Sequence, residues 1–238
     1  MSQPQRTLLA LLFLAGFTHA TASLAIVGGQ VYNFEDGTTQ GWVVGLLGTP
    51  SPVPPVNMAT GGPLGAGDSF LQLSSLGGGG PGSRLVAINV GQWTGDYTAG
   101  GITGIAMDLR NLGATDLSVR LYLENPMGAP ATADAVTSAF DLPAGGGWMH
   151  AQFAIDALSL TALHGDVNTL LSNVTALRIV HSPTAAFPGQ AMLGTLGVDN
   201  VTALPVPEPS TFALSALGLA GLLAWRQRRS TSARARTE

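Results

Sequence analysis

The chain has 238 residues, with 10 basic and 14 acidic side chains and no cysteine. The absence of cysteine excludes disulfides, thiolate catalysis and thiolate metal sites together. Glycine is abundant at 32 residues, but 45% of the residues are hydrophobic, so the composition indicates a loop-rich globular protein rather than a disordered one.

The N-terminus has the features of a secretory signal peptide. Arg6 supplies a positive charge, residues 8–17 are apolar, and the small residues at 20–22 offer a cleavage site. We therefore expect residues 1–25 to direct the chain to the general secretion machinery and to be removed by signal peptidase. Residues 26–204 are then the passenger domain.

The passenger domain is long enough for one hydrophobic core and too short for two. It carries four arginines against twelve acidic residues, which gives it a net charge of −8. An acidic domain repels nucleic acid, so we expect no nucleic-acid partner.

Apolar residues alternate with polar ones along the passenger, which predicts β-strands. In residues 117–124 the odd positions are leucine or valine, so one face should lie in the core and the other, with Arg120, Tyr122 and Glu124, in water. About nine or ten such strands predict an all-β fold, an antiparallel β-sandwich, with one brief helix at residues 166–171. The other strand-like runs are residues 31–34, 42–47, 70–76, 85–90, 102–109, 135–140, 148–155, 176–180 and 197–203.

Two segments between these runs have no periodicity. Residues 48–63 contain five prolines and three glycines, and residues 77–82 are almost entirely glycine. We expect both to be exposed connections.

No catalytic motif is complete. The glycine run lacks the Gly-Lys-Ser/Thr of a phosphate loop, and the chain has no Gly-x-Ser-x-Gly elbow or His-Glu-x-x-His pair. The passenger histidines His150, His164 and His181 are far apart and have no partner motif. Glu124 stands alone in its strand, and nothing selects the pair of carboxylates that glycan hydrolysis uses. We therefore expect a protein that is not an enzyme.

The two ends of the passenger resemble a known type of sandwich domain. Residues 33–42 read Asn-Phe-Glu-Asp-Gly-Thr-Thr-Gln-Gly-Trp, and residues 197–201 read Gly-Val-Asp-Asn-Val. This pattern resembles the laminin-B (domain IV) and carbohydrate-binding-module type of jelly roll, which opens with Phe-Glu and closes with an Asp-Asn-Val/Ile strand. The resemblance implies a jelly roll that binds a glycan.

The resemblance also implies site residues. In many such jelly rolls the opening glutamate and the closing aspartate share a structural calcium, which implies Glu35 and Asp199 here; the alternative is that both acids only cap turns. Sugar binding in these folds uses exposed aromatic side chains that stack on the sugar ring. The aromatic candidates are Trp42, Trp93, Tyr97, Tyr122 and Trp148; the alternative is that the tryptophans of a domain with so few aromatic residues lie mostly in the core.

Residues 205–229 have the order of a membrane-sorting signal. A proline-punctuated motif is followed by an apolar run at 211–225 and then by arginines. The run predicts a C-terminal transmembrane helix, and the arginines should keep residues 230–238 in the cytoplasm as a tail. The motif is Pro207, Glu208 and Pro209, and the flanking arginines are Arg226, Arg228 and Arg229.

This order resembles the PEP-CTERM sorting signal of Gram-negative bacteria. The resemblance implies an exosortase as partner, a membrane protease that cuts near the motif. It also implies an exported protein, held in the inner membrane with its passenger in the periplasm and then delivered to the cell surface or outside.

These features together predict an exosortase-sorted surface or extracellular-matrix protein that binds a glycan and is linked to exopolysaccharide or biofilm. Two alternatives remain open. One is a hydrolase or lyase acting on a glycan with an unrecognised carboxylate pair, and the other is a purely structural, adhesive protein.

Overall fold

A computed structural model describes residues 26–45, 51–128, 131–206 and 220. The expected signal peptide, the sorting motif, the arginine cluster and all but one residue of the expected transmembrane run lie outside these ranges. Among the described residues, no helix combines the length and the apolar character that a membrane span requires.

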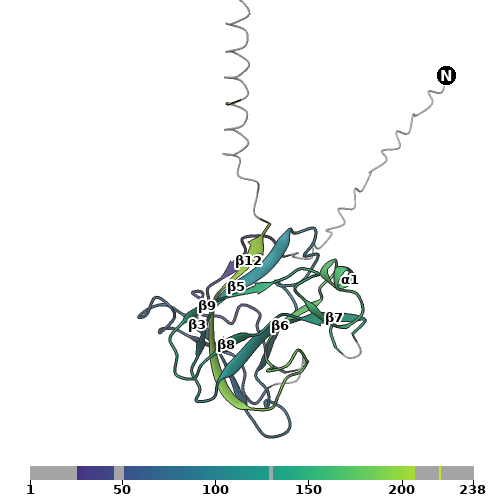
Figure 1. Cartoon of the computed structure of the whole chain (residues 1–238). Coiled ribbons are helices and arrows are strands. Elements are labelled where there is room, and N and C mark those ends of the chain that lie inside the picture. The colour runs from purple at the N-terminus through teal and green to yellow at the C-terminus, as the bar shows by residue number, and fades with distance from the viewer. Residues whose placement is uncertain (1–25, 46–50, 129–130, 207–219, 221–238) are drawn as a thin grey trace, which may run out of the picture.

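The described chain forms two antiparallel sheets packed face to face, which confirms the predicted all-β sandwich (Figure 1). The strand order in sheet A is β2 (Val56–Met58), β3 (Phe70–Leu76), β12 (Leu193–Pro205), β5 (Ile102–Asn111) and β9 (Met149–Ala154), with β1 (Val31–Tyr32) paired to β12. The order in sheet B is β10 (Thr161–His164), β7 (Ala133–Val136), β6 (Leu117–Asn125), β11 (Ala176–His181) and β4 (Val86–Asn89), with β8 (Phe140–Leu142) paired to β6.

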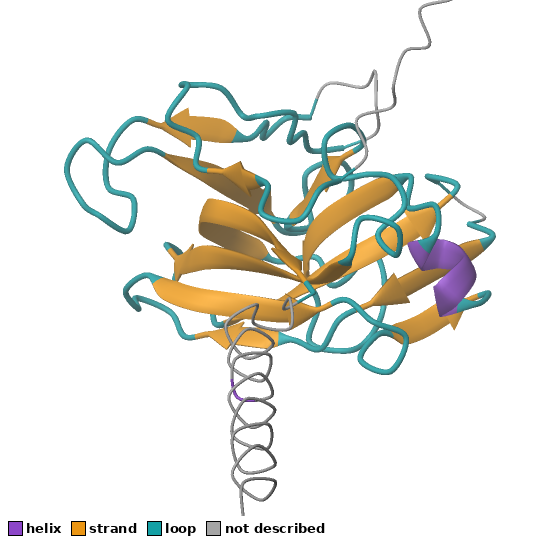
Figure 2. Cartoon of the chain, turned by 90° about the horizontal axis from the view of Figure 1, so that it is seen from above, coloured by secondary structure: helices purple, strands orange, loops and turns teal. Residues whose placement is uncertain are grey.

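The predicted helix is present as α1 (Val167–Leu171), at one edge of the sandwich (Figure 2). Asp166 is its N-cap, and the Asp166 carboxylate accepts a hydrogen bond from the backbone N–H of Thr169 at 2.8 Å. Leu170 and Leu171 are buried, so the helix is held by its apolar face.

The period-two pattern places one face of each sheet in the core. Leu121 of β6 lies opposite Ile179 of β11, and both are buried in a cluster that also contains Ile105 and Leu109 of β5. The sequence therefore assigned the inward face of β6 correctly.

Some elements differ from the sequence-based prediction. Residues 48–63 were expected to be a connection only, but they contain β2, which pairs with β3 at the edge of sheet A. Residues 135–140 were expected to form one strand and are split between β7 and β8, and β10 was not predicted. Each of these strands has four residues or fewer, too short for alternation to be visible in the sequence. In the described part of the run expected at 42–47, only an isolated bridge between Val43 and Ile88 forms.

The outer face of β6 does not lie in water as expected. Tyr122 and Glu124 are only 2% and 1% exposed. The connection between β11 and β12, residues 182–192, crosses the outer face of sheet B, and its Phe187 ring stacks on Tyr122. We call this connection the strap.

Leu121→Ala should lower the free energy of unfolding by about 2–5 kcal/mol, because it removes buried apolar atoms and leaves a cavity. Leu158 is 98% exposed, so the matched change Leu158→Ala should alter it by no more than about 0.5 kcal/mol. Denaturant titration of both variants measures the difference. Equal effects would contradict the assignment of the core face.

Candidate functional site

The outer face of sheet B contains a cavity of about 600 Å³. Its walls come from β6, β7, β10 and β11, and the strap closes it on one side. We call it the sheet-B cavity, and its lining residues are Tyr122, Glu124, Gly128, Ala131, Asp134, Leu163, His164, Arg178, Phe187 and Pro188.

Strand register brings the polar side chains of the cavity together. Tyr122 of β6 lies opposite Arg178 of β11, and Glu124 of β6 lies opposite Asp134 of β7. Directly opposed residues point to the same face of an antiparallel sheet, with Cβ atoms about 4.5–5.5 Å apart. Four side chains that are distant in sequence therefore share one surface.

Arg178 and Glu124 form a buried ion pair. Nε of Arg178 donates to Oε1 of Glu124 at 2.9 Å, and Nη2 donates to the same oxygen. The two side chains are 10% and 2% exposed. Glu124, which the sequence left without a partner, therefore has its charge matched in a place where water is largely excluded.

Tyr122, Asp134 and His164 form a second polar chain. The Tyr122 hydroxyl donates to Asp134 Oδ2 at 2.6 Å, and His164 Nδ1 lies 2.8 Å from Asp134 Oδ1. Burial, followed by the hydrogen bond to Asp134, raises the pKa of Tyr122 above its ordinary value, so the hydroxyl remains a donor. The Asp134 side chain is 6% exposed whereas the His164 side chain is 71% exposed, so His164 is the member of this hydrogen-bonded chain that contacts solvent.

Apolar side chains also border the cavity and pack beside it. Tyr122, Val136 and Val180 form a small cluster separate from the main core, with Leu163 and Phe187 packed against it. The Phe187 and Tyr122 rings are stacked with centroids 4.1 Å apart and an angle of 9° between their planes.

The structure separates the aromatic candidates. Trp42, Trp93 and Tyr97 are no more than 1% exposed and belong to the core, so they present no ring face to a sugar and the expectation that they bind glycan is wrong. Because the domain has few aromatic residues, its largest rings are used to fill the core. Trp148 is half-buried just before β9 of sheet A, and its ring lies nearly perpendicular to that of Phe70, at an angle of 78°.

Tyr122 alone among these candidates lines the sheet-B cavity, and Phe187 covers one face of its ring. Sequence reasoning missed Phe187, Asp134, His164 and Arg178 as a group. The available signal was weak: Phe187 is an isolated aromatic residue in a proline-containing connection.

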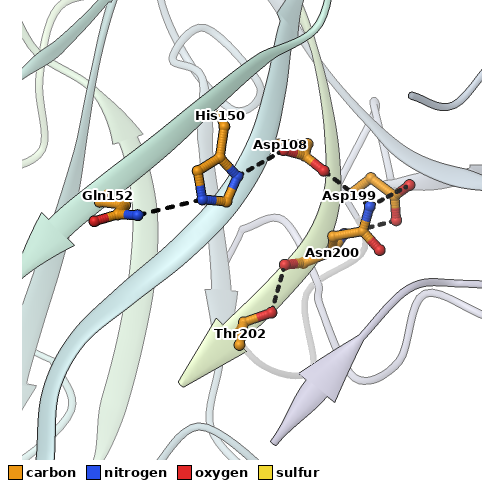
Figure 3. Close-up of polar contacts among 6 residues, drawn as sticks. All are labelled: Asp108, His150, Gln152, Asp199, Asn200 and Thr202. Atoms are coloured by element: carbon orange, nitrogen blue, oxygen red, sulfur yellow. Dashed lines mark hydrogen bonds and ion pairs between the residues drawn. The ribbon is translucent and has the colours of Figure 1, made fainter. Parts of the chain in front are cut away.

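A second polar cluster lies on the outer face of sheet A (Figure 3). Asp108 of β5 lies opposite both Asp199 of β12 and His150 of β9. His150 Nδ1 is 2.9 Å from Asp108 Oδ1, and the Asn200 side-chain amide donates to Asp108 Oδ2 at 2.9 Å. Like His164, His150 thus has an aspartate partner on a neighbouring strand, which no local motif could have indicated.

Asp199 is 1% exposed and surrounded by acids. Burial raises the pKa of its carboxyl to about 7, and the negative charges of Asp68, Asp108 and Glu35 add to this effect. Glu35 lies in a pocket with Asp68 and Asn200, and its Oε1 accepts a hydrogen bond from the backbone N–H of Ser69 at 2.8 Å. Glu35 and Asp199, the two residues expected to bind calcium, are therefore close enough for their negative charges to repel each other.

The oxygen-rich composition of this cluster suits a hard cation, but its geometry is incomplete as a site made of side chains alone. In the described part of the chain, no three His, Cys, Asp or Glu side chains are arranged to hold a metal ion. Calcium accepts backbone carbonyl and amide oxygens as well as carboxylates.

The fold is similar to that of carbohydrate-binding modules. A family 11 carbohydrate-binding module from Clostridium thermocellum, solved with a β-1,3-1,4-mixed-linked tetrasaccharide, matches 77% of this chain and 99% of its own with a TM-score of 0.50 and 12% identity. An exo-β-agarase matches 76% of this chain with a TM-score of 0.54 and 14% sequence identity. The agarase AgWH50C also matches 76% of this chain, with a TM-score of 0.50 and 12% sequence identity. At these identities the likeness establishes the fold alone.

The chain spans about a quarter of each agarase, 26% and 25% of their lengths. Comparison of the sequence with curated proteins gives no match.

Residues 205–229 match the PEP-CTERM protein-sorting motif. The chain carries this sorting signal. The PEP-CTERM signal implies an exported protein that is processed by an exosortase, as the resemblance of the tail led us to expect. Its match begins at Pro205, the last residue of β12, so the signal follows the sandwich directly.

Arg178→Met should lower the free energy of unfolding by about 3–5 kcal/mol, because Glu124 is then left charged and buried without a partner. Adding Glu124→Gln to Arg178→Met should recover much of that loss, since the unpaired charge is gone. A double-mutant cycle by denaturant titration measures the coupling. Additive effects would mean that the ion pair contributes nothing to the stability of the cavity.

Proposed function

We propose that the exported passenger domain binds a glycan in the sheet-B cavity. The observation that carries this proposal is a cavity of about 600 Å³ in which aromatic, acidic and basic side chains are held together on one sheet face. The fold supports it, because a carbohydrate-binding module of the same fold was solved with a tetrasaccharide.

The cavity offers both kinds of contact that a sugar requires. Hydroxyl groups of a sugar donate and accept hydrogen bonds, and the carboxylates of Glu124 and Asp134 accept while Arg178 donates. The apolar faces of sugar rings can contact Leu163 and Phe187. Because the ion pair and the Tyr122–Asp134–His164 chain already fix these groups, binding loses little side-chain entropy.

The same contacts favour binding over catalysis. Glycoside hydrolysis requires one carboxylic acid to protonate the leaving group and a second carboxylate to act as nucleophile or base. Glu124 and Asp134 are neighbours, but Glu124 is committed to Arg178, and Asp134 to Tyr122 and His164. The raised pKa of Tyr122 also makes it a poor general base for a lyase. We therefore propose a binding protein and not an enzyme.

The sorting signal gives this binding a location. We propose that the precursor is held in the inner membrane with its passenger in the periplasm, and that exosortase processing then delivers the passenger to the cell surface or matrix, where exopolysaccharide is its partner. Cell fractionation with mass spectrometry of the mature C-terminus tests this route. Extracellular protein that still contains residues 226–238 would contradict it.

We further propose that calcium binds at Glu35 and Asp199, with carbonyl or amide oxygens completing its coordination. Glu35 follows β1 and Asp199 lies in β12, so the ion would join the N-terminal segment to the central strand of sheet A. It would also neutralise the buried carboxylate of Asp199, whose pKa is raised by burial and, to a smaller extent, by repulsion from Asp68, Asp108 and Glu35.

Calcium should change the pH dependence of stability. In chelator, the free energy of unfolding should decrease as the pH rises from about 4 to 7. In this range folded Asp199 keeps a proton that the unfolded chain has already lost. Calcium favours the ionised carboxylate, so at pH 7 a hundredfold excess of calcium over its Kd should increase the free energy of unfolding by about 2.7 kcal/mol and raise the melting temperature.

Asp199→Asn should abolish both the decrease in stability with rising pH and the stabilisation by calcium. Asp156→Asn, at an exposed turn, should leave the stabilisation by calcium intact. Thermal unfolding in calcium and in chelator measures both effects. Identical melting curves for the unmodified protein in the two conditions would exclude the calcium site.

His164→Ala should weaken glycan binding several-fold, because the exposed imidazole extends the cavity network and a hydrogen bond contributes about 0.5–1.5 kcal/mol. His150→Ala is a matched control, since it removes an exposed histidine paired with an aspartate at a similar distance on sheet A. Isothermal titration with mixed-linked β-glucan, xylan and agarose fragments measures both. Equal losses in the two variants would place the binding site elsewhere, and no binding by the unmodified protein would argue against the proposed function.

A further inference from the structure

The strap divides the outer face of sheet B into two hollows. Arg178 and Pro188 line the sheet-B cavity, and they also line a second hollow of about 320 Å³ that extends over β4 to Val86 and Arg84. Since both hollows share these two residues, they are adjacent, with Pro188 of the strap between them. A chain lying across the sheet from one hollow to the other would meet the strap.

The strap is held at both of its ends by arginines from sheet B and its margin. Nε of Arg120 donates to the carbonyl oxygen of Ser182 at 2.8 Å, and Nε of Arg84 donates to the carbonyl oxygen of Gly189 at 3.0 Å. The backbone N–H of Met192 donates to the carbonyl oxygen of Ser83 at 2.9 Å. These bonds fix the backbone before and after Phe187.

The middle of the strap is fixed by packing. Phe187 stacks on Tyr122, and the guanidinium carbon of Arg178 lies 5.0 Å from the centroid of the Phe187 ring. Gly189 has φ +80°, and a Cβ there would collide with the carbonyl oxygen of His181. At Gly189 the strap therefore lies too close to the end of β11 for a side chain, and lifting the strap would break the stacking and the hydrogen bonds together.

We infer that the sheet-B cavity binds the end of a glycan chain and not an internal stretch of it. This inference rests on the proposed glycan binding. An internal stretch continues as polymer in both directions and needs an open path across the sheet, and on the side of the second hollow that path meets Pro188 of the strap, which lines both hollows. A chain end needs only one way out of the cavity, and the fixed strap provides a wall against which the terminal sugar stops.

The experiment compares intact and partially hydrolysed polysaccharide at equal mass. Mixed-linked β-1,3-1,4-glucan, xylan and agarose are each offered intact and after graded hydrolysis, and binding capacity of the exported protein is measured per mass of sugar. For chain-end binding, the capacity rises in proportion to the number of ends, so doubling the ends doubles the capacity. A capacity that does not change with the number of ends, in a polysaccharide that binds, overturns the inference.

Two variants test whether the strap is the cause. Phe187→Ala removes the stacking on Tyr122, and Arg84→Gln removes the bond to Gly189, so both should reduce the dependence of capacity on chain ends. Arg110→Gln is the control, because within the described residues Nε of Arg110 has no hydrogen-bond partner to lose. Far-ultraviolet circular dichroism and melting temperature establish that each variant is folded.

The outcomes separate the two proposals. Absence of binding by every polysaccharide, to the unmodified protein and the variants alike, overturns the proposed function and this inference with it. Binding that follows chain ends in the unmodified protein and loses that dependence in the strap variants supports both. Binding that follows chain ends equally in all variants contradicts the role of the strap, and binding that appears only in Phe187→Ala contradicts chain-end recognition.

Discussion

The buried ion pair between Arg178 and Glu124 is the constraint on which the outer face of sheet B depends. Removing two charges from water costs several kcal/mol for each ion, and this cost is offset only when the pair is well matched and its other polar atoms are bonded. Two nitrogens of Arg178, Nε and Nη2, donate to one oxygen of Glu124, and the pair lies between neighbouring strands whose register brings the two side chains together. With the charges matched, the strap can cover this face and form a cavity.

The strap also links the cavity to the C-terminal part of the chain. It begins at the end of β11, the strand that carries Arg178, and leads into β12, the strand shared by β1, β3 and β5 in sheet A. After β12, the backbone N–H of Val206 is still bonded to the carbonyl oxygen of Gly101, at 2.7 Å. The match to the sorting signal begins within this ordered segment, so the proposed binding site and the sorting signal are connected by a single long strand.

The two exposed histidines illustrate how position in the fold decides the use of a residue. His150 and His164 each lie within 3 Å of an aspartate on an adjacent strand, and both are more than half exposed. His164 borders a cavity with Tyr122, Arg178 and Phe187, whereas His150 lies on the outer face of sheet A beside the buried carboxylate of Asp199. A histidine–aspartate pair of the same geometry therefore borders the proposed glycan site on sheet B and belongs to an acidic cluster on sheet A.

The sequence by itself determined the sandwich class, the inward face of β6, the capped helix α1 and the PEP-CTERM signal, because each depends on residues that are close together in the chain: a period of two, an N-cap, or a proline motif, an apolar run and arginines in succession. Only the tertiary structure decided the site. Glu124 and Arg178, or Asp134 and His164, meet through strand register over separations of 54 and 30 residues. Alternation shows that Tyr122 and Glu124 point away from the core, but not that a distant connection then covers them. Whether an outward-facing residue lies in water or in a cavity depends on which loop crosses it, and that is fixed by the packing of the whole chain.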